Sequence, residues 1–191
     1  MSPPGPQSTV LCVDDDPDIV ASVARFLRLD GHDVVTCTSP VQALAVLGAR
    51  TVAVMVSDYE MPEMTGVELA VKARRLQPET VRILLTGRGT LDTAVEGINV
   101  GEVFRFLSKP FDPDALRREV IAAIGHHAEI SAAAREKTTV VRRQKLVTAL
   151  EADYPGITAV PRDDDGAYLL DGDAHHQAGP VLSAMTALIH R

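Results

Sequence analysis

Short apolar runs alternate with longer stretches of helical pattern along the first two thirds of the chain. The runs are rich in Val, Ile, Leu or Phe and comprise Thr9–Val13, Asp33–Cys37, Val52–Ser57, Val81–Leu85 and Val103–Leu107. Runs of this length and composition are typical of buried parallel strands, because helices cover both faces of such a sheet. Since right-handed crossovers join parallel strands, the pattern predicts an α/β fold with a doubly wound, five-stranded parallel sheet.

Proline and capping residues mark where the intervening helices begin. Pro17, Pro40 and Pro113 stand at predicted first-turn positions, where the missing N–H is harmless. Ser39 and Asp112 precede two of these prolines as N-caps. The predicted helices are Pro17–Leu29, Val41–Leu47 entered through Pro40, Val67–Leu76, one from about Leu91 to Val100, and one that begins at Pro113.

Polar residues follow four of these strands, at the point where each apolar run ends. Asp14 and Asp15 follow the first run, Asp58 the third, and Thr86 and Lys109 the last two. In an open α/β sheet the carboxyl ends of the strands meet at one edge, and ligands bind there. We therefore expect these five side chains to form one site.

The residue types at this site predict phosphoryl chemistry. Three carboxylates in one cleft require a cation, and an all-oxygen ligand set suits Mg²⁺. Lys109 offers a positive charge and Thr86 a hydroxyl for phosphoryl oxygens. Together these groups match transfer of a phosphoryl group to an aspartate. An EF-hand calcium loop is excluded, because Ile19 stands where that loop needs Gly and Arg25 where it needs Glu.

The motifs at the strand ends resemble a known family. They are Asp14-Asp15-Asp16-Pro17, the stretch from Ser57 to Gly66 with Asp58 and Pro62, Leu85-Thr86-Gly87, and Phe106-Leu-Ser-Lys109-Pro110-Phe111. In this order and spacing, residues 8–125 resemble the CheY-like receiver domain of two-component response regulators. The resemblance implies a flavodoxin-like sheet and control by phosphorylation.

The resemblance also implies individual roles around the phosphorylated residue. Asp58 would be the phosphoacceptor, taking its phosphoryl group from a phosphohistidine on a sensor histidine kinase or phosphotransfer protein. Asp15 and Asp58 would ligate Mg²⁺ directly, together with the backbone carbonyl of Glu60. Asp14 would act on the metal largely through water.

Three further positions gain roles from the same resemblance. Thr86 and Lys109 would bind the phosphoryl oxygens. Phe106 occupies the aromatic switch position, whose inward turn accompanies movement of Thr86, although plain core packing is an equal alternative for this ring. We interpret Arg88 as a surface charge, with contact to the phosphoryl group as the alternative.

The pattern changes after residue 125. We divide the chain into a receiver domain (8–125), a helical linker that also serves dimerisation (126–153), and a small output or interaction module (154–191). In the last part, Asp163-Asp164-Asp165-Gly166 predicts a hairpin turn and Pro180–Ile189 a short helix. This part is too short to bury a core of its own, so we expect it to dock on something.

Composition and charge restrict the binding partners and the cellular location that we expect for this protein. The formal net charge of −7 argues against a protein that coats nucleic acid or an anionic membrane. Met1–Ser8 lacks the apolar core of a signal peptide, and no apolar run is long enough to span a membrane. Cys12 and Cys37 lie in predicted strands and are interpreted as reduced, buried fillers. We therefore expect a cytoplasmic protein without a membrane partner.

Two hypotheses remain for the output. The favoured one is a signalling protein that is not an enzyme beyond its self-catalysed phosphoryl uptake and loss. It would act through phosphorylation-dependent protein contacts or as a homodimer, and nucleic acid is not expected as a partner. The alternative is a DNA-binding transcriptional regulator that uses the basic segment Arg135–Lys145. The pairs His126-His127 and His175-His176 lack further ligands at metal spacing, so no zinc site is expected.

Overall fold

The structure is a computed structural model that describes residues 8–87 and 103–153. The strands in these residues are β1 (Thr9–Val13), β2 (Asp33–Cys37), β3 (Val54–Asp58), β4 (Val81–Thr86) and β5 (Arg105–Ser108). The helices are α1 (Pro17–Leu29), α2 (Pro40–Ala49), α3 (Gly66–Leu76) and α5 (Pro113–Asp153). The helix expected near residues 91–100 and the hairpin and helix expected after residue 154 lie outside the described residues.

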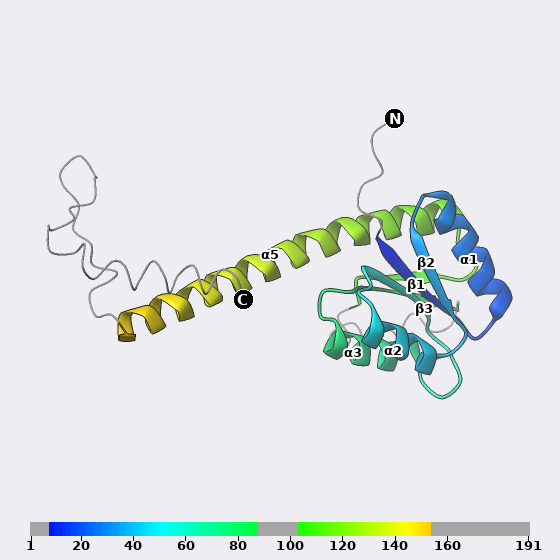
Figure 1. Ribbon diagram of the computed structural model, residues 1–191. Helices are drawn as coiled ribbons and strands as arrows, with labels where there is room; N and C mark the ends of the chain where they lie inside the picture. The colour runs from blue at the N-terminus through cyan, green and yellow to red at the C-terminus, as the bar shows by residue number, and fades with distance from the viewer. Residues whose placement is uncertain (1–7, 88–102, 154–191) are drawn as a thin grey trace, which may run out of the picture. The chain divides into compact units, whose positions relative to one another are not determined.

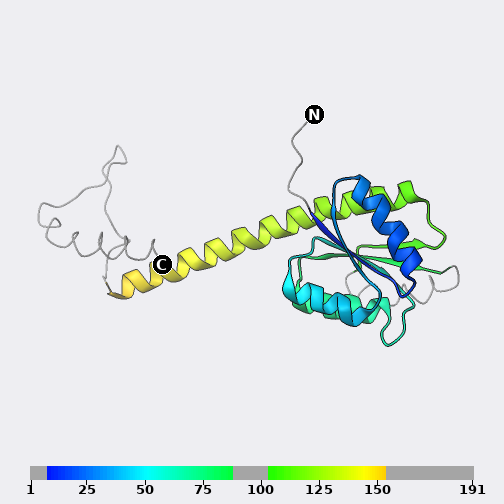
Figure 2. The same ribbon diagram turned by 45° about the vertical axis from the view of Figure 1, so that its right-hand side comes forward.

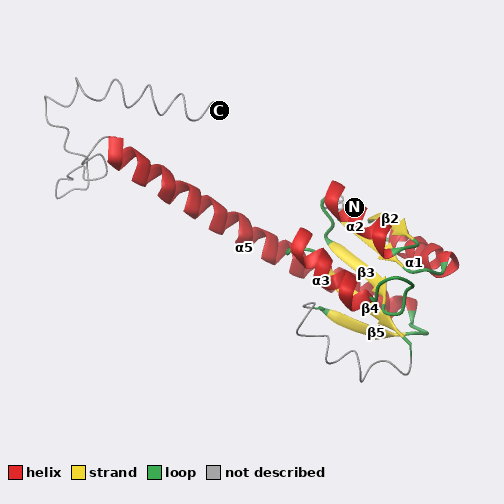
Figure 3. Ribbon diagram, turned by 90° about the horizontal axis from the view of Figure 1, so that it is seen from below, coloured by secondary structure: helices red, strands yellow, loops and turns green. Residues whose placement is uncertain are grey.

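All five strands run parallel in one sheet, in the order β2-β1-β3-β4-β5. β1 lies inside the sheet, with β2 on one side of it and β3, β4 and β5 on the other. Figure 3 shows β5 at one edge of the sheet, beside β4. The predicted doubly wound, flavodoxin-like fold is therefore confirmed.

Helices cover both faces of the sheet, as Figures 1 and 2 show. On one face, Leu27 of α1 and Leu116 and Val120 of α5 are fully buried against the sheet. On the other face, Leu47 of α2 and Leu69 of α3 form the second core cluster. Because both faces are covered, the three inner strands β1, β3 and β4 contain no exposed residue, and this explains their continuous apolar runs.

Three strands differ from the predicted runs at their ends, and β4 differs only in that it also includes Thr86. β3 begins at Val54 rather than Val52, and β5 covers Arg105–Ser108 rather than Val103–Leu107. Val52 and Val103 are nevertheless buried, at 0% and 9% exposure. Apolar character reports burial, whereas a strand also requires pairing, so the apolar run and the strand need not share their ends.

The helix starts follow the predicted capping chemistry. Ser39 caps α2 through its side chain, and the backbone N–H of Asp114 donates to the Asp112 carboxylate at 3.2 Å. Asp16 caps α1, with its carboxylate accepting from the Asp18 N–H. Thr65 and Glu68 form a reciprocal capping box at α3, which satisfies two backbone donors. The loops at the carboxyl ends of the strands are thus held by side chains as well as by the sheet.

Helix α5 is a single element of 41 residues. It runs through Gly125, the last residue of the predicted receiver domain, into the predicted helical linker, and the two compact units of the chain meet between Arg135 and Glu136. A helical Gly costs only about 1 kcal/mol relative to Ala, and the flanking residues are good helix formers. In the first unit, His127 Nδ1 lies 2.9 Å from the Glu79 carbonyl oxygen. The receiver's packing therefore continues past Gly125.

The part of α5 from Arg135 to Leu146 is exposed at every residue. Among the described helices, none has the length and hydropathy that crossing a membrane requires.

Candidate functional site

The register of the sheet places the predicted site residues at one edge. Val13 pairs with Ser57, so Asp14 and Asp58 follow the same rung on β1 and β3. Asp58 itself pairs with Leu85, which brings the end of β4 beside it. Because Thr86 in turn pairs with Ser108, the residue after Ser108 also arrives at this edge. Parallel pairing alone thus gathers side chains from four segments of the chain.

Lys109 joins the first two carboxylates. Its Nζ lies 2.7 Å from Asp14 Oδ2 and also forms an ion pair with Asp58 Oδ1. The Lys109 side chain is 23% exposed, while those of Asp14 and Asp58 are 5% and 8% exposed. The backbone N–H of Lys109 donates to the Thr86 carbonyl at 2.6 Å and holds the lysine at the end of β4. These ion pairs are shielded from water and are therefore stronger than pairs on the surface.

Burial shifts the pKa of Asp14, the most deeply buried carboxylate of the site. Desolvation raises the pKa of Asp14 above its ordinary value, although the Lys109 ammonium and the Asp16 N–H both favour the ionised form. Burial also acts to lower the pKa of Lys109, but hydrogen bonds and charge from Asp14 and Asp58 outweigh it, so the pKa is raised. The lysine is therefore charged at neutral pH.

The loop after β3 fixes the orientation of Asp58. The Glu60 N–H donates to Asp58 Oδ2 at 3.0 Å, and the Tyr59 N–H donates to the Leu85 carbonyl at 2.8 Å. Gly66 returns the loop so closely that a Cβ there would lie 2.2 Å from the Asp58 carbonyl oxygen. Only glycine fits at that position. Within the same loop, Glu63 has a φ of 70°, a left-handed conformation that favours glycine.

The acidic cluster has the composition of a hard-cation site. Carboxylate oxygens of Asp14, Asp15 and Asp58 all lie within 4.8 Å of one another. Asp15 is exposed, whereas the other two are buried. Three carboxylates against one ammonium leave an excess of negative charge, which a divalent cation with oxygen ligands would neutralise. The residues present therefore fit Mg²⁺.

The structure brings Asp14, Asp15, Asp58 and Lys109 together, as the strand ends predicted. Thr86 lies at the same edge, but it is fully buried, and its hydroxyl donates to the Gly87 carbonyl at 3.2 Å. Three other expected residues are less directly placed. The Phe106 ring is partly buried against the α2/α3 core cluster, the Glu60 side chain is exposed, and Arg88 lies outside the described residues.

Sequence reasoning missed several residues that shape this site and its sheet. The capping role of Asp16 and the Thr65–Glu68 box are both visible in the sequence as N-cap patterns. The close approach at Gly66, the first residue of α3, becomes apparent only once the path of the preceding loop is known. Arg82 is buried in β4 at 5% exposure. A charged residue inside an otherwise apolar run was the one available indication of it.

The sequence matches the response regulator receiver domain family over residues 10–121. It is 34% identical over 142 residues to the transcriptional regulatory protein GlrR of Escherichia coli K12, a match that covers 74% of this chain and 32% of that protein. The matched part therefore spans about a third of that relative's length.

Two solved structures are similar in fold. One, described as adenylate cyclase from Rhodopirellula baltica, is 34% identical with a TM-score of 0.66, and the match covers 69% of this chain and 98% of that one. A CheY-like response regulator receiver domain protein from Methanospirillum hungatei is 27% identical with a TM-score of 0.61, covering 65% of this chain and 98% of that one.

We predict that Asp14→Asn raises stability at neutral pH in metal-free buffer. A carboxyl whose pKa is raised on folding contributes stability below its unfolded pKa, and that contribution is lost as pH rises through the folded pKa. The amide resembles the protonated acid, so the advantage of the variant should grow from pH 4 towards pH 7. Urea unfolding in excess chelator measures this difference.

Asp15→Asn is the matched control for Asp14→Asn, because Asp15 belongs to the same cluster but is exposed. Its effect should be the smaller of the two. An Asp14→Asn protein that is less stable than wild type at pH 7 would contradict the expectation.

Proposed function

The chain belongs to the response regulator receiver domain family, and on that premise we propose that it accepts a phosphoryl group on Asp58 from a sensor histidine kinase or phosphotransfer protein. The observation that supports this most directly is the contact of one lysine ammonium with two buried carboxylates at the strand ends. Asp58 ends the central strand β3, and its second carboxylate oxygen is held by the Glu60 N–H. The proposed role is that of a signalling protein rather than of an enzyme acting on other substrates.

The proposed transfer uses groups that the site already holds. An Asp58 carboxylate oxygen attacks the phosphorus of the phosphohistidine, the new O–P bond forms, and the N–P bond breaks with its electron pair remaining on the imidazole. Lys109 contacts Asp58 before transfer, and its ammonium would then lie beside the phosphoryl oxygens. Asp14 keeps the lysine in position through the 2.7 Å ion pair.

We assign Mg²⁺ to the acidic cluster. Asp15, Asp58 and the backbone carbonyl of Glu60 would hold it directly, with Asp14 acting through water. When bound, the ion would offset the negative charge of the carboxylates and of the incoming phosphoryl group. The exposure of Asp15 supports this assignment, because an exposed carboxylate can supply ligand oxygen at the mouth of the site.

Thr86 and Phe106 would couple phosphorylation to the surface. The Thr86 hydroxyl now donates to the Gly87 carbonyl, so donation to a phosphoryl oxygen requires it to turn. Such a turn changes the space beside β4. The Phe106 ring, which is only partly buried on the neighbouring strand β5, can move into that space.

We assign the output to protein contacts made by α5, with a second copy of the chain as partner. Val140 and Leu146 are 60% and 40% exposed. Successive helix residues are about 100° apart, so Val140, Leu146, Val147 and Leu150 share one stripe, and Val141 falls off it. Closed two-fold dimers are the commonest oligomers, and each large side chain buried there contributes about 1.5–3 kcal/mol.

DNA binding is the second candidate. It is favoured by the relative GlrR, which is a transcriptional regulatory protein, and by the exposed basic residues of α5 between Arg135 and Lys145. Our expectation that nucleic acid is not a partner, made from the acidic net charge, gains no support from these relatives. The match covers only 32% of GlrR, so this assignment depends on the chain's own basic segment.

Asp58→Asn should abolish phosphoryl uptake from a small acyl phosphate while the protein stays folded. The amide cannot act as the nucleophile. Intact-mass analysis after incubation with the donor and Mg²⁺ detects the adduct. The Asp33→Asn protein, changed at a partly exposed acid of β2 that pairs with Arg50, should label like wild type. Equal labelling of the Asp58→Asn protein would rule out Asp58 as the acceptor.

Excess chelator should block the same uptake, and Asp15→Asn should reduce it by at least about tenfold at limiting Mg²⁺, because one ligand and one charge are lost. Asp18→Asn is the control, since Asp18 is an exposed acid of α1 close in sequence to the cluster. Wild-type labelling that continues undiminished in chelator would show that the site does not depend on a divalent metal.

Val140→Glu should convert a dimer of the full chain into a monomer, because it places a charge in the proposed apolar stripe. Val141→Glu, the same change one residue away and off the stripe, should leave the dimer intact. Light scattering at micromolar concentration, with and without a phosphoryl mimic, measures both. A wild-type protein that is monomeric in both states contradicts the proposed dimer without bearing on Asp58.

A further inference from the structure

The outer edge of β2 presents backbone groups that the sheet does not use. β2 lies at the end of the sheet, beside β1. The N–H of Asp33 and the carbonyl of Cys37 hydrogen-bond to the residues that flank β1. In a parallel ladder, alternate residues of a strand turn both backbone groups to the same neighbour. Val35 thus also faces β1, whereas the N–H and C=O groups of Val34 and Thr36 point out of the sheet.

This edge has the composition of a segment that pairs readily with another strand. Val34, Val35 and Thr36 are β-branched, and residues 34–38 contain no charged residue, Gly or Pro. Short uncharged segments of high β-propensity are the ones that associate edge to edge. The one charged residue of β2, Asp33, is ion-paired with Arg50. The sequence of β2 therefore does little to repel a second strand.

Arg28, in the last turn of α1, reaches this edge. Its Nη2 donates to the Val34 carbonyl oxygen at 3.1 Å. The guanidinium thus takes the place that a backbone N–H of a further strand would occupy, and it brings a positive charge to an otherwise uncharged edge.

A second copy of β2 is the strand that fits this edge. Two β2 strands related by a two-fold axis run antiparallel, with Val35 opposite Val35 of the second copy. Each Val34 would then exchange both backbone hydrogen bonds with Thr36 of the other copy. Half of these bonds need the Val34 carbonyls, which Arg28 already contacts. The pairing would also bring the two guanidinium groups to one short ladder, where like charges repel.

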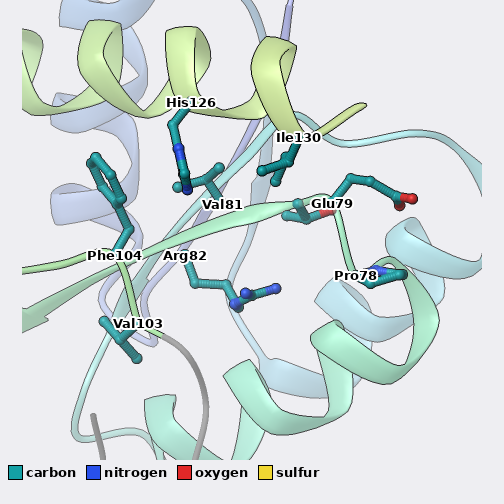
Figure 4. A pocket seen from close by; sticks show the side chains of 9 residues that line it. Pro78, Glu79, Val81, Arg82, Val103, Phe104, His126 and Ile130 are labelled. Atoms are coloured by element: carbon teal, nitrogen blue, oxygen red, sulfur yellow. The ribbon is translucent and has the colours of Figure 1, made fainter. Parts of the chain in front are cut away.

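The strand at the other end of the sheet, β5, has protection of a different kind. Its first residue, Arg105, is charged and forms an ion pair with Glu119 of α5 at 2.9 Å. The preceding residue, Phe104, stacks on His126 of α5, and Figure 4 shows these two side chains beside each other. β5 thus carries a charge of its own, whereas the charge at β2 comes from α1.

We propose that Arg28 is an autoinhibitory contact that keeps β2 from pairing with β2 of a second copy. Its loss frees the Val34 carbonyl, removes the charge from the edge and opens β2 to antiparallel self-association. The contact is separate from the proposed dimer of α5 and from the phosphoryl site, since neither uses Arg28 or the edge of β2.

Arg28→Met tests the proposal in the full-length protein, because methionine keeps an unbranched side chain without the N–H donors or the charge. In light scattering over a concentration series, its average mass should rise to about twice that of wild type, as one edge pairs with another. Any association through α5 is common to both proteins. A wild-type mass at every concentration would overturn the proposal.

Arg25→Met is the matched control. Arg25 is an exposed arginine of the same helix, and its guanidinium lies over the Phe26 ring, 5.4 Å from the centroid. This variant should keep the wild-type mass. An equal rise in mass for Arg25→Met and Arg28→Met would contradict a specific role of Arg28.

Amide hydrogen exchange shows whether β2 is the surface that pairs. The Val34 and Thr36 amides point outward, so in Arg28→Met their exchange should slow by at least about tenfold as the mass rises. The Val35 amide faces β1 and should keep its wild-type exchange rate, which distinguishes edge pairing from local unfolding. Association that leaves the Val34 and Thr36 amides unprotected would overturn the proposal.

Thr36→Pro gives an independent test of the same edge. Proline has no N–H and is tolerated where the N–H of an edge strand faces away from the sheet. Added to Arg28→Met, it should return the mass to that of wild type, and Arg28→Ala replaces Arg28→Met if the latter does not fold. Self-association that persists in the double variant would rule out pairing through β2.

Discussion

The ion pairs of Lys109 with Asp14 and Asp58 are the contact on which the active edge of this protein depends. Two carboxylates that are buried side by side would repel each other, and burial already raises the pKa of Asp14. The ammonium between them makes their shared burial possible. With Asp15 included, the site holds three carboxylates and one ammonium. The resulting excess of negative charge suits a divalent cation.

The sheet and its site follow closely from the sequence, because one pattern determines both. Buried parallel strands need apolar runs, and the polar residue that follows each run lies at the carboxyl edge of the sheet, so the sequence predicts that Asp58 and Lys109 belong to one site. Burial of Asp14 and exposure of Asp15 could not be predicted, since both follow β1 directly and only the turn into α1 separates them. The predicted strand starts at Val52 and Val103 were wrong, because both residues are buried but lie outside the paired strands.

Helix α5 continues from the receiver domain into the predicted helical linker. It passes through Gly125, and the first compact unit extends to Arg135. A helical glycine costs little when the flanking turns are already formed, since the nucleus of the helix exists and each further residue adds a hydrogen bond. Tertiary contacts such as the one between His127 and the Glu79 carbonyl also stabilise the helix beyond Gly125, and the sequence pattern of α5 does not predict them.

Strand β4 carries a different chemistry at each of its ends, which gives it a special place in the fold. Thr86 ends it at the acidic cluster, and the buried Arg82 is its second residue, with only apolar residues between them. Its neighbours are β3, which bears Asp58, and β5, which bears Phe106 and leads to Lys109. Under the proposed function, a turn of Thr86 would act first on β5, because Thr86 pairs with Ser108 of that strand.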